Sequence, residues 1–147
     1  MKHYTDGKLP YFDSSHLSDP SNSYVAWLDV MGTRAVMSRS LSMSATFICK
    51  LHVTAIEAAV GKNIRLYPVM DGLYVVANTR ALISGFLETV FSRLADVFIN
   101  ESAQHHRFIV KAAIAYGPII HGSDIGSNAS WSLDEHAEYK RSILLAG

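Results

Sequence analysis

The apolar residues of this chain recur with helical spacing in two long segments. The first begins at Leu41 and can end at Gly61, because glycine readily adopts the left-handed conformation that closes a helix. The second follows a cap at Asn78 or Thr79. Its predicted core face consists of Ile83, Phe86, Leu87, Val90, Phe91, Leu94 and Phe98. A third, shorter helix is predicted from Tyr139 to Ala146.

Shorter runs of β-branched, aromatic and aliphatic residues predict strands at 23–30, 64–70, 73–77, 108–116 and 119–121. Asp71-Gly72 separates two of these runs and is a strong signal for a hairpin turn, and Gly117-Pro118 separates the last two. The order is therefore strand, helix, hairpin, helix and two further strands. It predicts an α+β sandwich of the ferredoxin-like type, with a mixed or antiparallel sheet and the helices on one face.

Composition indicates one folded domain after a short polar segment. The chain has 147 residues, nearly half of them hydrophobic, which is enough for a substantial core. Residues 1–23 are rich in Ser, Asp, Pro and His, and we expect them to form a flexible N-terminal arm before a domain at 24–147. The formal net charge is zero, which disfavours bulk nucleic-acid binding and a ferredoxin-like RNA-binding module.

Targeting signals and cysteine usage point to the cytoplasm. Cys49 is the only cysteine, which excludes an internal disulfide and fits a reducing compartment. The N-terminus does not have the basic and then apolar pattern of a secretory signal. No apolar run approaches the roughly 20 residues that span a bilayer. We therefore expect a cytoplasmic protein without a membrane span.

Two aspartates lie at the ends of apolar runs. Asp29 follows the run 24–28 and Asp71 follows the run 64–70, and each has a glycine nearby, Gly32 and Gly72. A carboxylate in such a place is costly to desolvate unless it is paired, hydrogen-bonded or bound to a metal. In the predicted topology the two would converge, which favours a two-metal site for phosphoryl chemistry. The alternative for each is a helix cap or a carboxylate satisfied by backbone groups.

Three segments, in this order and spacing, resemble the class III nucleotide cyclase homology domain. The first strand of that family ends in an Asp-hydrophobic-x-Gly pattern, matched by 29–32, and its hairpin carries a second metal-binding aspartate, matched by Asp71. A later strand pair carries a basic residue, small residues and a glycine-rich turn, matched loosely by 111–122. The resemblance covers 24–147. It implies two Mn²⁺ or Mg²⁺ ions held by Asp29, Asp71 and the backbone carbonyl of Val30.

Within that superfamily the chain looks most like the bacterial Pycsar pyrimidine cyclases, which make cyclic UMP or cyclic CMP in antiphage defence. Purine cyclases usually have a base-reading lysine four residues before the hairpin aspartate, where this chain has Tyr67. The usual Arg-Gly-Gly of the family is Lys111-Ala112-Ala113 here. The helix that supplies transition-state groups in the family would lie beyond Gly147, so we expect the domain to lack its C-terminal part and this form to be inactive if it is truncated.

The resemblance also implies a set of substrate-binding residues. The loop after the first strand, formed by Met31, Gly32, Thr33 and Arg34, would hold phosphate through exposed amides, although an ordinary turn with Thr33 as helix cap is the simpler alternative. Lys111 would contact phosphate, or else be an edge lysine whose ammonium reaches solvent. Tyr67 would read the base, or else pack across the sheet.

The function implied by the resemblance is a nucleotide cyclase that converts UTP or CTP to the 3′,5′-cyclic monophosphate and pyrophosphate. Class III sites are completed across a head-to-tail homodimer, so a homodimer is implied, as is a separate effector that senses the cyclic product. Two alternatives stay open at this point. One is a non-catalytic nucleotide-binding regulatory module on the same fold, and the other is a purine cyclase that makes cyclic AMP or cyclic GMP.

Overall fold

A computed structural model describes residues 11–146, so residues 1–10 of the predicted arm at 1–23 lie outside the described residues. The described chain forms two compact units. Residues 22–117 make up one of them, here called the sandwich unit. The segments on either side of it, 11–21 and 118–146, make up the other, here called the terminal unit.

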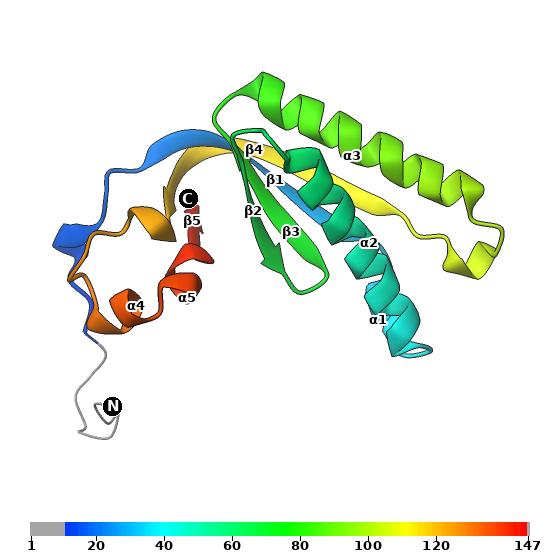
Figure 1. The fold of residues 1–147 in the computed structure, drawn as a ribbon, viewed down its shortest axis with the longest axis horizontal. Coiled ribbons are helices and arrows are strands. Elements are labelled where there is room, and N and C mark those ends of the chain that lie inside the picture. Colours follow the sequence, from blue (N-terminus) through cyan, green and yellow to red (C-terminus); the bar gives the residue numbers. More distant parts are fainter. Residues whose placement is uncertain (1–10, 147) are drawn as a thin grey trace. The chain divides into compact units, whose positions relative to one another are not determined.

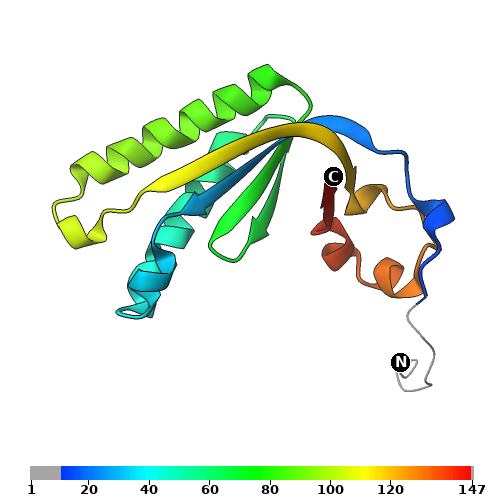
Figure 2. The same cartoon turned by 180° about the vertical axis from the view of Figure 1, so that it is seen from behind.

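The sandwich unit consists of a sheet with two long helices on one face (Figures 1 and 2). Its strands are hydrogen-bonded in the order β2-β3-β1-β4. The bounds are β1 Ser21–Val30, α1 Thr33–Met37, α2 Leu41–Ala59, β2 Ile64–Val69, β3 Gly72–Ala77, α3 Arg80–Asn100, the 3₁₀ turn η2 Gln104–His106 and β4 Val110–His121. Strand β3 is antiparallel to both β1 and β2. This is the predicted α+β sandwich with an antiparallel sheet, and the fold prediction is confirmed.

The core lies between the sheet and helices α2 and α3. Alternate residues of β1, namely Ala26, Leu28 and Val30, are at most 1% exposed and pack with the inner faces of both helices. Period-two burial of this kind leaves the intervening residues of β1 on the opposite face of the sheet. On α3 the predicted core face is largely confirmed: Ile83, Phe86, Leu87, Val90 and Leu94 are buried and Phe91 is partly buried against them.

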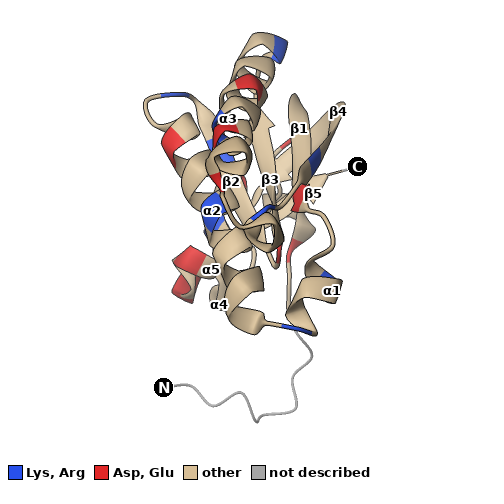
Figure 3. Ribbon diagram, turned by 90° about the vertical axis from the view of Figure 1, so that its right-hand side faces the viewer, with Lys and Arg blue, Asp and Glu red and all other residues tan. Residues whose placement is uncertain are grey.

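Charged residues of both signs lie along α3, which carries Arg80, Glu88, Arg93 and Asp96 in turn (Figure 3). Among the described residues, no helix combines the length and the apolar character that a bilayer-spanning segment requires.

Strand β4 corrects the prediction of two separate strands at 108–116 and 119–121. It runs without interruption from Val110 to His121, through Gly117-Pro118. Proline holds φ near −65°, which an extended strand tolerates, and it lacks only the amide donor. The dipeptide therefore removes one hydrogen-bond donor from the strand without turning the chain.

The terminal unit contains short elements only. They are η1 Ser14–His16, η3 Gly122–Asp124, α4 Trp131–Glu135, α5 Ala137–Arg141 and β5 Leu144–Ala146. Strand β5 pairs antiparallel with the end of β4, so that Ile119 lies opposite Ala146. The predicted helix from Tyr139 to Ala146 is therefore right only up to Arg141. The apolar residues after it complete a strand pair instead of a helical turn.

The hairpin between β2 and β3 turns one residue earlier than the sequence suggests. Val69 pairs with Gly72, so the two turn residues are Met70 and Asp71 rather than Asp71 and Gly72. Met70 has a positive φ of 50°, which is unusual for a residue other than glycine. Gly72 is instead the first residue of β3, where it is buried under the ring of Trp27. The close approach of the Leu28 backbone oxygen and of that ring, and not the turn, is what requires glycine here.

Replacing Gly72 by alanine should therefore destabilise the sandwich unit strongly. A Cβ at this position would lie 2.7 Å from Cη2 of Trp27 and even closer to the backbone oxygen of Leu28. Overpacking against backbone should lower the free energy of unfolding by roughly 3 kcal/mol.

Gly85 provides the matched control for this substitution. It lies in α3, and a Cβ there would meet nothing within 4 Å. Gly85→Ala should raise the free energy of unfolding by about 0.5–1 kcal/mol through helix propensity. Urea denaturation of both variants measures the difference. Equal effects would contradict the close contacts with Leu28 and Trp27 as the reason for glycine at position 72.

Candidate metal and nucleotide site

Asp29 lies at the end of β1, on the face of the sheet opposite the helices. Its neighbours Leu28 and Val30 belong to the core, so the strand alternation directs Asp29 away from it. The side chain is only 18% exposed, and its Oδ2 atom lies 3.0 Å from Nζ of Lys111 on β4. Just beyond β1, the amide of Met31 donates to the carbonyl of Ile109 at 2.8 Å. The later residue on the β1 side, Met31, contacts the earlier residue on the β4 side, Ile109. This order is that of an antiparallel pair of strands.

Asp71 lies in the β2–β3 turn, at the same end of the sheet. Asp29 pairs in register with Gly72, the residue directly after Asp71. The hydroxyl of Thr33, the first residue of α1, donates a hydrogen bond to Oδ2 of Asp71. The structure thus brings the β1–α1 connection and the hairpin turn together, with one carboxylate from each side.

The donor set at this place fits hard divalent cations. The two carboxylates and the adjacent backbone carbonyl of Val30 are oxygen donors, which Mg²⁺ and Mn²⁺ prefer. The described residues contain no group of three His, Cys, Asp or Glu side chains that could hold a metal by itself. A metal here would therefore complete its coordination with oxygens from a substrate or from water, as is usual for magnesium in phosphoryl-transfer sites.

The loop 31–34 differs in detail from its prediction. The alternative that made Thr33 the helix cap is wrong: Gly32, with a φ of 76°, is the N-cap of α1. Thr33 is buried, and its hydroxyl donates a hydrogen bond to Asp71 instead of capping the helix. Arg34 is exposed, and Met31 is 51% exposed.

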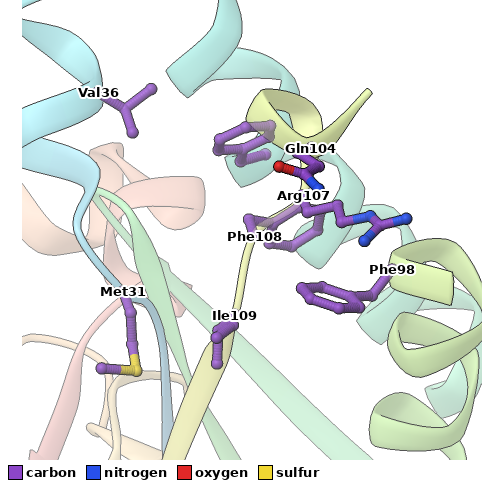
Figure 4. A pocket seen from close by; sticks show the side chains of 8 residues that line it. Met31, Val36, Phe98, Gln104, Arg107, Phe108 and Ile109 are labelled. Atoms are coloured by element: carbon purple, nitrogen blue, oxygen red, sulfur yellow. The ribbon is translucent and has the colours of Figure 1, made fainter. Parts of the chain in front are cut away.

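Met31 also contributes to a pocket of about 430 Å³ that the sequence did not indicate (Figure 4). The lining is mainly apolar and comes from Met31, Val36, Phe47, Phe98, Gln104, Arg107, Phe108 and Ile109. The Arg107 guanidinium carbon lies 5.3 Å from the centre of the Phe98 ring, and its Nε donates to the carbonyl of Glu101. These contacts hold the end of α3 against the segment that leads into β4.

Tyr67 is on the same face of the sheet as Asp29, but two strands away. It pairs with Tyr74 on β3, which in turn pairs with Trp27 on β1. The rings of Trp27 and Tyr74 are 4.6 Å apart. Tyr67 itself is only 5% exposed. Tyr67 therefore packs across the sheet. If it also contacts a base, it does so as a side chain that its neighbours hold in place.

Two contacts of the site were not expected from sequence: the Lys111–Asp29 ion pair and the Thr33–Asp71 hydrogen bond. The signal for the first was present, since Lys111 is the only charged residue in the segment 108–120. Finding its partner requires the register of β4 against β1, which the sequence does not provide.

Comparison with known proteins gives matches at the level of structure only. No protein-family model matches the chain, and no curated protein matches it by sequence. Several solved structures are similar to it. A bacterial light-regulated adenylyl cyclase has a TM-score of 0.60 at 8% identity, covering 71% of this chain and 33% of that one.

Two fungal guanylyl cyclase domains are similar as well. The monomeric domain of the RhoGC fusion protein from Blastocladiella emersonii has a TM-score of 0.60 at 12% identity, covering 89% of this chain and 80% of that one. The domain of RhGC from Catenaria anguillulae, in complex with GTP, has a TM-score of 0.53 at 11% identity, with coverage of 69% and 59%. The chain spans only part of several of these structures. It covers 33% and 57% of two structures of a bacterial light-regulated adenylyl cyclase and 59% of the Catenaria domain. At such identities the likeness concerns the fold, and the fold of this chain is that of the class III nucleotide cyclase domains.

Proposed function

We propose that this chain is a nucleotide cyclase that converts UTP or CTP to the 3′,5′-cyclic monophosphate and pyrophosphate. One observation carries the proposal. Two carboxylates, Asp29 and Asp71, lie at the same end of neighbouring strands on a cyclase fold. Asp29 pairs in register with Gly72, the residue directly after Asp71. Oxygen ligands in this arrangement suit a pair of Mn²⁺ or Mg²⁺ ions, which would supply charge neutralisation and lower the pKa of a bound hydroxyl.

In the proposed reaction, the ribose O3′ attacks the α-phosphorus, the bond to the β-phosphate oxygen breaks, and pyrophosphate leaves. The 3′-hydroxyl loses its proton to solvent or to a substrate oxygen. Asp29, Asp71 and the Val30 carbonyl would hold the cations, and Thr33 fixes the orientation of the Asp71 carboxylate. Lys111 and the loop residues Met31, Gly32, Thr33 and Arg34 would bind the triphosphate.

The pyrimidine assignment rests on Tyr67. A tyrosine offers a bulky ring and one hydroxyl where a purine cyclase would have lysine, so the ring would narrow the base pocket. Its low exposure of 5% supports a fixed wall rather than a mobile side chain. The purine alternative has its own support, because similar structures are described in complex with GTP and with ATPαS. Signalling in antiphage defence through a cyclic-nucleotide-sensing effector is what the resemblance to the Pycsar enzymes implies, and a cytoplasmic location fits the single cysteine, Cys49.

A homodimer belongs to the same proposal. Similar guanylyl cyclase domains are described both as a dimer and as a monomer. We therefore expect self-association of this chain to become stronger when the nucleotide and Mn²⁺ are both present.

A non-catalytic nucleotide-binding module is the second candidate, and one observation favours it. Both carboxylates already have partners within the chain, Lys111 for Asp29 and Thr33 for Asp71. A fold that no longer bound metal would satisfy the two carboxylates in this way.

Turnover separates the two candidates. A full-length version of the protein is incubated with Mn²⁺ and each of the four nucleoside triphosphates, and the products are resolved by mass spectrometry. A cyclic monophosphate with stoichiometric pyrophosphate supports the cyclase. Saturable nucleotide binding with no cyclic product from any of the four supports the binding module.

A further inference from the structure

Lys111 forms an ion pair with Asp29, a proposed metal ligand, and phosphate binding alone does not explain this contact. Its ammonium nitrogen lies 3.0 Å from Oδ2 of Asp29, while 59% of the lysine side chain is exposed, against 18% for the aspartate. The carboxylate is thus held in the protein, whereas the lysine reaches it from solvent on a flexible stem. Because the lysine end of the pair is exposed, the ammonium can move away from the carboxylate toward solvent or a ligand.

We propose that Lys111 competes with free divalent cations for Asp29 and transfers to the substrate's phosphates once nucleotide is bound, so that metal and nucleotide bind cooperatively. This inference rests on the proposed function, because it takes Asp29 as a metal ligand. A cation entering alone must displace the ammonium and remain close to a positive charge. A cation entering with a nucleotide brings anionic oxygens that give the ammonium a new partner.

The position of Lys111 supports this exchange. It lies on β4 next to the end of β1, in an otherwise apolar or small-residue segment that contains Ala112, Ala113 and Ala115. Among the ion pairs found in the described residues, only that with Lys111 involves Asp29 or Asp71. Lys111 and the residues that follow it to position 116 are exposed, so the lysine can move between the carboxylate and a ligand over the same face of the sheet.

Mn²⁺ binding without turnover tests the proposal. Free Mn²⁺ is measured by electron paramagnetic resonance, first without nucleotide and then with 3′-deoxy-UTP, which lacks the attacking hydroxyl. Lys111→Met should bind Mn²⁺ alone about fivefold more tightly than the unaltered chain, because the competing charge is gone. The increase in Mn²⁺ affinity that the nucleotide causes should be smaller in this variant.

Two further variants serve as controls, and circular dichroism checks the fold of each. Lys111→Arg keeps the competing charge, so Mn²⁺ alone should bind no more tightly to it than to the unaltered chain. Lys50→Met removes a lysine that pairs with Glu101 at 3.9 Å, so the net charge changes equally but away from Asp29. Equal Mn²⁺ affinity of Lys111→Met and the unaltered chain, or equal tightening by Lys50→Met, would overturn the inference.

The outcome also distinguishes this inference from the proposed function. If Asp29→Asn weakens Mn²⁺ binding but Lys111→Met leaves it unchanged, the metal site stands and the competition is wrong. If Asp29→Asn leaves Mn²⁺ binding unchanged, the metal site itself is wrong, and the inference fails with it.

Discussion

Replacing either Asp29 or Asp71 by asparagine should abolish nucleotide cyclisation while the protein remains folded. Each substitution removes one ligand charge and nearly preserves side-chain shape. Losing several kcal/mol of charge stabilisation should lower the rate by on the order of a thousandfold or more. The measurement is cyclic product formed per unit time with Mn²⁺ and UTP or CTP.

Stability should change little in the same two variants. The amide oxygen of an asparagine at position 71 would still accept the hydrogen bond from Thr33, and at position 29 the loss is one partly exposed ion pair. We expect the free energy of unfolding to stay within about 1 kcal/mol of the unaltered chain. Asp96→Asn, an exposed site on α3, is the matched control and should leave both rate and stability unchanged. Near-normal turnover in either site variant of an active enzyme would show that the two-metal hypothesis is wrong.

Base choice is the second large effect, and it depends on Tyr67. A ring at this position should exclude two-ring bases, and we expect UTP or CTP to be preferred over ATP and GTP by about a hundredfold. UTP is expected to be slightly favoured over CTP on family resemblance. Competition among all four nucleotides, with cyclic products separated by mass, measures the preference.

Removing only the hydroxyl tests the role of Tyr67 further. Tyr67→Phe keeps the ring and should keep the exclusion of purines, but it should lower kcat/KM for the preferred pyrimidine by about tenfold, because a polar group of the base loses its partner. Tyr74→Phe, the same change at the register partner of Tyr67, should have no such effect. Cyclic AMP or cyclic GMP as the main product would contradict the pyrimidine assignment and leave the cyclase assignment standing.

The fold could be predicted from the sequence because the burial pattern and the local structure agree. On α3, the spacing from Ile83 to Leu94 specifies both the helix and its buried face. The errors arose where a tertiary contact decides. Gly72 looks like a turn residue, yet it pairs with Val69 at the start of β3, where the Leu28 backbone oxygen and the Trp27 ring leave no room for a side chain, and the turn residues are Met70 and Asp71. Likewise, Pro118 looks like a break, but an extended strand accommodates it.

The candidate site could be predicted in its parts but not in its connections. Asp29 and Asp71 are recognisable because a carboxylate at the end of an apolar run is costly to desolvate unless it has a partner or a metal. Their present partners, Lys111 and Thr33, depend on strand register and on where α1 begins. A shift of one residue in the strand register or in the start of α1 would direct the Lys111 or Thr33 side chain elsewhere. No local sequence pattern specifies the register or that start.

The location of bound manganese tests the central claim most directly. A crystal grown with Mn²⁺ and 3′-deoxy-UTP is measured at a wavelength where manganese scatters anomalously. The account predicts manganese peaks at coordination distance from the carboxylates of both Asp29 and Asp71 and from the nucleotide phosphates. Manganese bound elsewhere, with Asp29 still paired to Lys111 and Asp71 contacting no metal, would contradict it.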